Sequence, residues 1–518
     1  MSVWTALRPG RDRQFVVAVT ALLLFFSFLH SLLVPLYRGP DEAQHLDMTV
    51  AVFEDLRWPA PGERYVDLTV RNTKNRSMWD LRKQRREEQD AVPREDRLTW
   101  SEIEVRLEGR PTDTGGRNPA SQHPFLYYAG LAGPWGLVQS AALGLNYDQV
   151  FALTRHLNLL LILPLPILVL ATARVLGTRR RTARLATLLV LAIPQLAQVG
   201  GLINNDNLLN LIGAVLFLLV AAVIRGDTTR RTSIALGVTF GVGMLTKGLA
   251  LFWAPWLAAV YLWLFARTRD VGVIVSGAWA AGVSLVVGGW WWLRNLIEFG
   301  RVQPRVLESP VDDPGPAEEL GTWLHAFGIR MVDGFWGRFG NLDAELPRLL
   351  TIALWVLLVV LIAAGVSSSR KATKERELDV PTTLLVVAPF VVSLVVLIGN
   401  SLMTYLRTSW AAGMQGRYLF SVLSGVFVVV AIALARWPRL REGHVLAVVI
   451  ALQVLGLFTM LNSWWGPRDQ GVSIFSSISS WLRWSPWPTE VVAAALVLLL
   501  AATWRAWRRD RLTSTTEA

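Results

Sequence analysis

The sequence predicts an all-α polytopic membrane protein. Of its 518 residues, 53% are hydrophobic, and the mean hydropathy is +0.39. Long apolar runs recur from end to end and are separated by short segments rich in arginine, which is the pattern of membrane-crossing helices joined by short loops. The chain contains no cysteine, which excludes disulfides, thiolate metal sites and cysteine nucleophiles.

The net charge of +12 is the second feature that bounds the function. Such a charge can indicate nucleic-acid binding. Here the arginines stand in short loops between apolar runs, so we interpret them as determinants of membrane topology and expect no nucleic-acid partner.

The first apolar run, residues 15–36, is long enough to cross a bilayer, which takes about 20 apolar residues. It lacks the small-residue cleavage site of a signal peptide, so we expect it to be retained. The arginines that precede it predict a cytoplasmic N-terminus. The run therefore delivers the segment that follows, Gly39–His45 (GPDEAQH), to the extracytoplasmic face.

This acidic segment is the first candidate site. If Pro40 starts a helix, Asp41 and His45 lie one turn apart on the same face. We expect partial desolvation to raise the pKa of Asp41 and so make it a better proton acceptor. A simpler interpretation is that Asp41 and Glu42 stand in the first turn of a helix, where acidic residues suit the positive end of the helix dipole.

A polar segment, residues 37–123, follows and is predicted to be an extracytoplasmic loop with interfacial helices. The next apolar segment, 125–143, is interrupted by three glycines and a proline. If it spans the membrane, six later arginine-rich segments fall outside the cell, whereas if it lies in the interface, all six fall in the cytoplasm. Because positive charge favours the cytoplasmic side of short loops, we predict that 125–143 does not span.

With this choice the chain crosses the membrane about twelve times and has both termini in the cytoplasm. The predicted spans are 15–36, 151–176, 184–202, 207–224, 232–247, 249–266, 271–292, 347–367, 381–400, 417–435, 444–461 and 489–506. We divide the chain into a transmembrane catalytic module at 1–300 that includes the loop 37–123, a second extracytoplasmic loop at 301–346, and C-terminal transmembrane helices at 347–518.

The polar residues that interrupt or flank the apolar runs gather on the outer side in this topology. They come from seven parts of the chain, and the candidates among them are Asp41, Glu42 and His45; His123, Tyr127 and Tyr128; Asn205 and Asp206; Lys247; Trp292, Arg294 and Asn295; Trp336 and Arg338; and Arg417 and Tyr418. Each has a simpler interpretation on its own. The tryptophans could form an aromatic belt, Lys247 and Arg417 could extend toward water from helix ends, Asp206 could be a helix N-cap, and Arg338 could be a solvated loop residue. Their convergence at one depth favours a function.

Transfer of a sugar from a lipid-linked phosphate fits this set of residues. Asp41 is the candidate general base for an acceptor hydroxyl, with Glu42 and His45 orienting it or tuning its pKa. Fixed cations would neutralise a phosphate leaving group, and the candidates are Arg294, Arg417, Lys247 and Arg338. The remaining polar and aromatic residues are candidate substrate contacts, because aromatic faces suit sugar rings and isoprenoid chains. They are His123, Tyr127, Tyr128, Asn205, Asp206, Trp292, Asn295, Trp336 and Tyr418.

In this order the motifs resemble the GT-C superfamily of polytopic glycosyltransferases, and most closely its DUF2142-type bacterial branch. The stretches that carry the resemblance are GPDEAQHLD (39–47), QHPFLYY (122–128), NNDNLLN (204–210), LTKGLALFWAP (245–255), WWWLRNLIEFG (290–300), DGFWGRFG (333–340) and QGRYLF (415–420). The resemblance implies a helical transmembrane core with juxtamembrane helices in the first outer loop. It also implies a polyprenyl-phosphate sugar donor, a catalytic acid at Asp41 with Glu42 beside it, and phosphate-binding cations at Arg294 and Arg417 and, less directly, at Lys247 and Arg338.

We therefore predict an inverting glycosyltransferase of the bacterial plasma membrane. Its partners would be a polyprenyl-phosphate sugar, a cell-envelope glycan or lipid-linked acceptor, and membrane lipids. No cofactor is firmly expected; a divalent metal could be held by Glu42 and His45 with Asp41, although their spacing is not diagnostic. The alternatives are a transporter or flippase of lipid-linked glycans, which would need polar residues through the bilayer thickness, and a non-catalytic scaffold that retains the fold.

Overall fold

The computed structural model describes residues 3–77, 92–111, 116–304, 306, 319–370, 377–409, 411, 413–466 and 474–515. Within these ranges, ten helical segments are long and apolar enough to cross a membrane. They are Val3–Leu33, Tyr147–Val175, Asp206–Ile224, Gly248–Thr268, Val271–Phe299, Arg348–Ser368, Val380–Thr408, Gly416–Ala435, Glu442–Trp465 and Thr489–Leu512. The predicted class, an all-α protein with many membrane-crossing helices, is confirmed.

An eleventh candidate span is a broken one. Arg180–Leu191 and Pro194–Gly200 qualify together but meet at an angle of 66°. The break falls where Pro194 begins the second piece, because proline cannot donate the helical hydrogen bond and ends the helix before it. The side chain of Gln453 donates to the carbonyl of Leu191 at 2.8 Å, so this carbonyl at the break is satisfied by a neighbouring helix.

The helices of these spans have the following bounds: α1 (Val3–Ala6), α2 (Arg13–Leu33), α7 (Tyr147–Ile162), α8 (Leu165–Val175), α9 (Arg180–Leu188), α10 (Pro194–Gly200), α11 (Asp206–Ile224), α13 (Trp253–Thr268), α14 (Val271–Ser284), α15 (Trp290–Phe299), α18 (Arg348–Ser368), α19 (Val380–Thr408), α20 (Leu423–Ala435), α21 (Glu442–Met460) and α23 (Thr489–Thr515). Short 3₁₀ or π segments extend several of them, among them η7 (Gly248–Phe252), η8 (Leu285–Gly289), η9 (Gly328–Asp333), η10 (Gly416–Val422) and η11 (Leu461–Trp465).

The predicted span 232–247 corresponds to α12 (Arg230–Met244), which has 15 residues. At 1.5 Å per residue it is about 22 Å long, less than the roughly 30 Å of a hydrocarbon core. The segment 125–143, predicted not to span, contains α6 (Leu126–Gln139), a 14-residue helix with Pro134 inside it. By the length criterion alone, ten segments or, with the broken one, eleven qualify in the described part of the chain, and α12 is the predicted span that falls short of it.

Shorter helices form a layer on one side of the spans. They are α3 (Glu42–Asp55), α4 (Leu68–Ser77), α5 (Trp100–Leu107), α6, α16 (Leu320–Phe327), α17 (Gly334–Trp336) and α22 (Ile474–Trp484). A two-stranded antiparallel hairpin, β1 (Arg338–Phe339) and β2 (Ala344–Glu345), pairs Arg338 with Glu345 and Phe339 with Ala344. Buried side chains of α3 to α7 form a core of their own, which includes Leu46, Tyr128 and Trp135.

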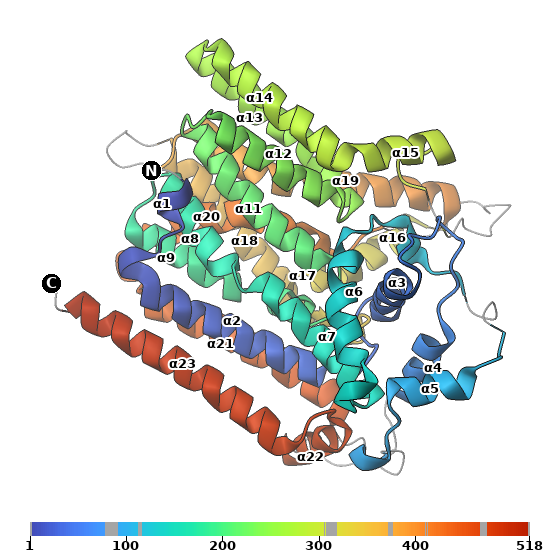
Figure 1. Cartoon of the computed structure of the whole chain (residues 1–518). Coiled ribbons are helices and arrows are strands. Elements are labelled where there is room, and N and C mark those ends of the chain that lie inside the picture. The colour runs from blue at the N-terminus through green and yellow to red at the C-terminus, as the bar shows by residue number, and fades with distance from the viewer. Residues whose placement is uncertain are drawn as a thin grey trace.

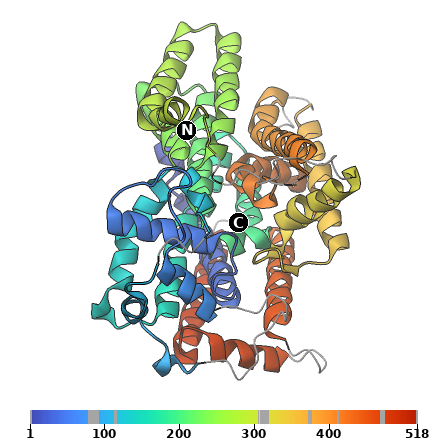
Figure 2. The same ribbon diagram turned by 90° about the vertical axis from the view of Figure 1, so that its right-hand side faces the viewer.

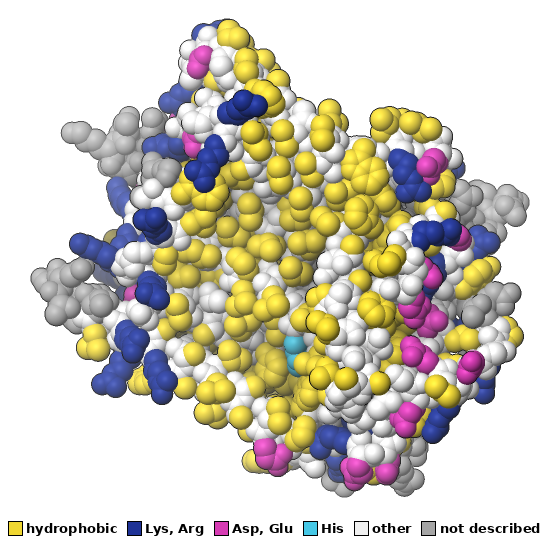
Figure 3. All heavy atoms as spheres, viewed as in Figure 1, with side chains coloured by type: hydrophobic (Ala, Val, Ile, Leu, Met, Phe, Trp, Pro, Cys, Tyr) yellow, Lys and Arg dark blue, Asp and Glu magenta, His cyan; other side chains and the backbone are white. Residues whose placement is uncertain are grey.

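The two sides of the molecule differ in chemistry. Both chain ends lie on the left in Figure 1, whereas α3 to α6, α15, α16 and α22 lie on the right. Lysine and arginine side chains line the left edge in Figure 3, an apolar band crosses the middle, and the acidic side chains gather mainly on the right. Seen from the right-hand side, the helices of the first outer loop and the segment that contains α16 lie on opposite sides of the molecule (Figure 2).

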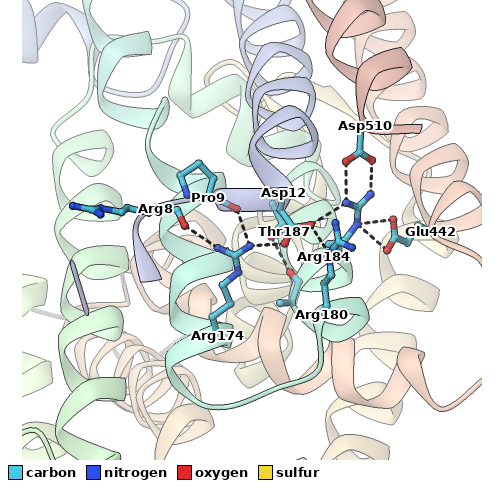
Figure 4. Close-up of polar contacts among 10 residues, drawn as sticks. Arg8, Pro9, Asp12, Arg174, Arg180, Arg184, Thr187, Glu442 and Asp510 are labelled. Carbon is cyan, nitrogen blue, oxygen red and sulfur yellow. Dashed lines mark hydrogen bonds and ion pairs between the residues drawn. The ribbon is translucent and has the colours of Figure 1, made fainter. Parts of the chain in front are cut away.

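On the side of the termini, an ion-pair cluster joins five helices (Figure 4). Asp12, which is 2% exposed, accepts hydrogen bonds from Arg174, Arg180 and Arg184. Arg184 also binds both carboxylate oxygens of Asp510, at 3.1 and 2.7 Å, and both oxygens of Glu442. The cluster therefore ties the start of α2 to α8, α9, α21 and α23.

Candidate active site

Asp41 stands at the turn between the first span and the outer layer. Helix α2 ends at Leu33, just before Pro35, and α3 begins at Glu42, two residues after the predicted start at Pro40. Asp41 takes the left-handed conformation with φ of 59°, which aspartate tolerates better than most residues. The amide of His45 donates to the Asp41 carbonyl at 2.9 Å, so the two residues lie one helical turn apart, as predicted.

Arg417 lies beside Asp41. It is the second residue of η10, its side chain is 3% exposed, and its Nη2 donates to Asp41 Oδ2 at 3.0 Å. Its Nε lies 3.3 Å from Asp206 Oδ2. The other oxygen of Asp206 accepts a short hydrogen bond from Lys247, whose Nζ also donates to Asn205 Oδ1 at 3.3 Å. Two carboxylates and two cations from four distant segments thus meet at one point.

The local structure explains how these residues reach each other. Asp206 is the first residue of α11, and its amide donates to the Asn204 side chain at 2.8 Å. Asp206 is therefore not the N-cap, and its carboxylate is left for the cations. Lys247 follows the last turn of α12 and precedes η7, with 8% of its side chain exposed. Because Lys247 and Arg417 are buried and paired, neither extends toward water.

Glycine is required next to Arg417. A Cβ on Gly416 would lie 2.3 Å from the backbone nitrogen of Phe335, which is closer than real side chains approach. Only glycine lets η10 pack this closely against α17, which carries Phe335 and Trp336. The motif DGFWGRFG thus contributes to the site through the backbone that supports Arg417.

The expected rise in the pKa of Asp41 is wrong. Burial acts to raise this pKa, but the charges of Arg417 and Lys247, with the hydrogen bond from Arg417, outweigh it, and the pKa lies below its ordinary value. Half of the Asp41 side chain, 51%, is exposed although protein atoms surround it densely. Asp41 is therefore an ionised carboxylate that a substrate can reach.

Two histidines on the wall of the site are uncharged at neutral pH. Burial is the main cause that lowers the pKa of His45 to about 4 and of His123 to about 3, and the charge of Lys247 lowers both further. His45 Nδ1 bonds the hydroxyl of Tyr128 at 2.9 Å, and the two rings stack with centroids 5.8 Å apart. Tyr127 donates to Asn158 at 2.7 Å, which ties α6 to α7.

Several buried polar atoms of the predicted site residues make no hydrogen bond within the described residues. They include Nη1 of Arg417, Nδ2 of Asn205, Nδ1 of His123 and Nε1 of Trp336. Buried donors are rarely left without an acceptor, because an unmade hydrogen bond costs about 1–3 kcal/mol. A guanidinium nitrogen beside an ammonium group, both buried, is suited to an anion with several oxygens, such as a phosphate.

Glu42 does not face this cluster. Its carboxylate is fully buried, and Arg155 of α7 binds both of its oxygens, at 2.8 and 2.6 Å. Sequence reasoning missed Arg155. The signal was an arginine inside the apolar run 151–176, since an ionisable residue within a membrane span is rare and has a partner or a function.

Two predicted cations bind residues close to them in the chain. Arg294 pairs with Glu298 at 2.8 Å, one turn along α15, and lies over the ring of Trp291. Arg338 binds Glu345 across the β-hairpin and donates to the Leu342 carbonyl at 2.9 Å. Neither has a contact with Asp41 in the described part of the structure.

Of the remaining candidates, one contacts the charged cluster and two form hydrogen bonds elsewhere. The ring of Tyr418 lies 4.7 Å from Nζ of Lys247 and 5.6 Å from the guanidinium carbon of Arg417, so it belongs to the cluster. Trp292 donates to the Met244 carbonyl at 3.2 Å and is buried, which is not the place of an aromatic belt. Asn295 donates to the Val302 carbonyl at 3.2 Å beyond the end of its own helix.

The residues considered for a metal do not form a ligand set. Arg155 holds the Glu42 carboxylate, and His45 Nδ1 is bonded to Tyr128. In the ranges that the structure describes, no three His, Asp or Glu side chains converge as metal ligands.

Comparison with known proteins gives a family match. The model of the family described as "Predicted membrane protein (DUF2142)" matches residues 24–426. No curated protein sequence matches the chain.

Among solved structures, the chain is similar to ArnT from Cupriavidus metallidurans bound to undecaprenyl phosphate, with 14% identity over 96% of this chain and 78% of that chain and a TM-score of 0.43. It is also similar to the archaeal oligosaccharyltransferase AglB from Archaeoglobus fulgidus in complex with an inhibitory peptide and a dolichol-phosphate. That match has 13% identity over 95% of this chain and 56% of that chain, with a TM-score of 0.43.

Proposed function

This chain belongs to the DUF2142 family of membrane proteins, and from its site we propose that it is a polyprenyl-phosphate-sugar-dependent glycosyltransferase. It moves the sugar to a cell-envelope glycan or lipid-linked acceptor on the extracytoplasmic face of a bacterial plasma membrane. The observation that carries the proposal is a reachable, ionised carboxylate, Asp41, held 3.0 Å from a buried guanidinium that still has an unbonded nitrogen, Nη1 of Arg417.

The chemical step uses these two groups directly. The acceptor hydroxyl attacks the anomeric carbon of the donor, the bond from that carbon to the phosphate oxygen breaks, and polyprenyl phosphate leaves with the electron pair. Asp41 takes the proton of the hydroxyl as the new glycosidic bond forms. Attack from the face opposite the phosphate inverts the anomeric configuration.

Arg417 and Lys247 neutralise the charge that grows on the departing phosphate. Both are buried and fixed by Asp206, so they need little rearrangement as the charge develops. Asp41 and Asp206 balance the two cations before the substrate binds. His45 and His123 are uncharged, so neither is an imidazolium that would give a proton to the Asp41 carboxylate.

The lipid tail of the donor would remain in the bilayer while its head group reacts. The arginine-rich side of the molecule, with both termini, lies opposite the site (Figures 1 and 3), and positive charge favours the cytoplasmic side. This arrangement supports a site outside the cell, where a lipid-linked sugar would meet an envelope acceptor.

The test is sugar transfer by the purified protein in vesicles that contain a radiolabelled polyprenyl-phosphate sugar and an envelope glycan acceptor. The substitution Asp41→Asn should lower kcat by about 100-fold or more, because a general base typically contributes that much. The control Asp55→Asn changes an exposed carboxylate at the end of α3 and should transfer normally.

Full transfer by the Asp41→Asn variant would remove Asp41 from the mechanism. Movement of intact donor across the vesicle membrane without release of its sugar would instead identify a transporter. Absence of transfer by the wild-type protein with every donor, together with normal function of the Asp41→Asn variant in cells, would identify a non-catalytic scaffold.

A further inference from the structure

Arg155 is the most completely bonded side chain near the site. It projects from α7, and 1% of its side chain is exposed. Two of its hydrogen bonds go to Glu42, one from Nε at 2.8 Å and one from Nη2 at 2.6 Å. The other three go to backbone carbonyls where α2 ends: Ser31 and Val34 from Nη1, at 2.9 and 2.6 Å, and Pro35 from Nη2, at 2.9 Å. All five N–H groups of the guanidinium are thereby used.

Glu42 extends the same network in the other direction. Its Oε2 accepts from the amide of Gly39 at 2.8 Å, and its Oε1 accepts from the amide of Ile203 at 3.2 Å. A Cβ on Gly39 would lie 2.5 Å from the Glu42 carboxyl carbon, so the glycine makes room for this folded-back side chain. The Asn204 side chain adds a contact at 3.5 Å to the Pro40 carbonyl.

The pair therefore fixes two loops that carry the charged groups of the site. One loop runs from Pro35 to Glu42 and holds Asp41, whose left-handed backbone needs such support. The other loop runs from Ile203 to Asp206 and leads into α11. Asp41 and Asp206 are in turn joined through Arg417, so the network closes into a ring.

We propose that the Glu42–Arg155 pair is a positioning device that holds Asp41 against Arg417, and that Glu42 does not itself contact the substrate. Its consequence for catalysis rests on the proposed function, whereas its geometry does not. Burying two charges is costly unless every bond is made, and here both side chains are saturated by the loops they hold. A saturated carboxylate without a free oxygen is a poor base and a poor metal ligand.

The absence of cysteine from the chain allows a direct measurement of this geometry. A thiol introduced by Asp41→Cys would stand beside Arg417, and a neighbouring cation lowers the pKa of a thiol below its ordinary value of about 8.5. The rate at which this thiol reacts with a small charged methanethiosulfonate, followed against pH, gives that pKa. Asp41 is half exposed, so the reagent can reach the position.

Glu42→Gln and Arg155→Lys are then added separately. Each keeps the size of the side chain but removes either the charge or the planar fork of donors. We expect the thiol pKa to move from its depressed value toward the ordinary one in both variants. A matched control is Asp148→Asn. Asp148 also lies on α7, and the substitution breaks its buried ion pair with Arg97, which makes no hydrogen bond or ion pair with Asp41 or Arg417 in the described part of the chain. This control should leave the thiol pKa unchanged.

Transfer kinetics give a second measurement. Glu42→Gln should lower kcat by about 100-fold, which is the usual cost of misplacing a reacting group by about 1 Å. Added to Asp41→Asn, the same substitution should cause little further loss, because it acts through Asp41. A role confined to stability would lower the amount of folded protein equally in both backgrounds and leave the thiol pKa where it was.

An unchanged thiol pKa in folded Glu42→Gln and Arg155→Lys proteins would overturn the positioning proposal, as would an equal change in the Asp148→Asn control. The two proposals also fail separately. If the thiol pKa depends on the Glu42–Arg155 pair but the protein transfers no sugar, the positioning proposal stands and the proposed glycosyltransferase activity is rejected.

Discussion

At the scale of single residues, the protonation states of the site decide its working pH range. Asp41 has a lowered pKa, and burial keeps the pKa of His45 at about 4 and that of His123 at about 3. None of these groups titrates near neutrality. A carboxylate base with a lowered pKa is ionised, and therefore able to accept a proton, at every pH above that pKa. Its ionised form is lost only when the pH falls below the pKa.

The first prediction follows for the pH dependence of transfer. We expect log(kcat/KM) to stay level from about pH 8 down to about pH 5, without the step near 6.5 that a titrating histidine of ordinary pKa would produce. In an Arg417→Gln variant the burial of Asp41 is no longer opposed by the adjacent charge, so the acid limb should move to higher pH. A wild-type profile that falls between pH 7 and 6, or an Arg417→Gln limb that does not move, would contradict the assigned charges.

At the scale of secondary structure, close backbone approach rather than helix length fixes the site. Helix α17 and the start of η10 touch through Gly416, and α3 begins immediately after the turn that holds Asp41. These contacts fix the backbone positions of Arg417 and Asp41, independently of their side-chain rotamers. Small shifts of these elements should therefore change chemistry more than stability.

The second prediction concerns Gly416→Ala. The added methyl would lie 2.3 Å from the Phe335 nitrogen, so η10 and α17 must move apart and carry Arg417 with them. We expect transfer to fall by more than about 10-fold and the free energy of unfolding to fall by about 1–3 kcal/mol, the usual cost of overpacking. Activity assays and thermal unfolding measure the two effects.

The matched control is Gly399→Ala in α19, where nothing lies within 4 Å of the new methyl. It should transfer normally and be as stable as the wild type or slightly more so, because alanine suits a helix better than glycine. Equal behaviour of the two variants would show that the approach at Gly416 does not matter.

At the scale of the whole molecule, a large ion-pair cluster holds helices together on the side that carries the termini. The cluster around Arg184 joins α2, α8, α9, α21 and α23 (Figure 4), far from the site in Figure 1. Its three arginines and three carboxylates balance one another, with Asp12 and Asp510 nearly buried. We therefore assign it a structural role, the anchoring of the C-terminal helix.

The third prediction tests that anchor with Asp510→Asn. Arg184 keeps Asp12 and Glu442 as partners, so we expect a loss of about 1–3 kcal/mol, less than the 3–5 kcal/mol typical of an unpaired buried charge. Protease should cut the C-terminal end of α23, where Asp510 lies, faster than in the wild type, while folded protein transfers sugar normally. The surface pair Arg57–Glu63 provides a control, because Arg57→Gln removes an exposed ion pair that contributes little to the free energy of unfolding.

The sequence by itself determined the class, the order of almost all the spans and the place of Asp41 at the end of the first one. Hydropathy is a local property, so a run such as 15–36 identifies a membrane helix without knowledge of its neighbours. Two predicted spans differ in form: 184–202 is broken before Pro194, and 232–247 forms a helix of only 15 residues.

Only the tertiary structure decided which charged groups meet. Arg417 lies 376 positions from Asp41 in the chain and reaches it, whereas Arg294 and Arg338 bind carboxylates nearer to them. Glu42, adjacent to Asp41, turns instead to Arg155, 113 positions away. Residue type shows that a side chain needs a partner, but the choice among many possible partners depends on distances of a few ångströms, which packing of distant helices alone sets.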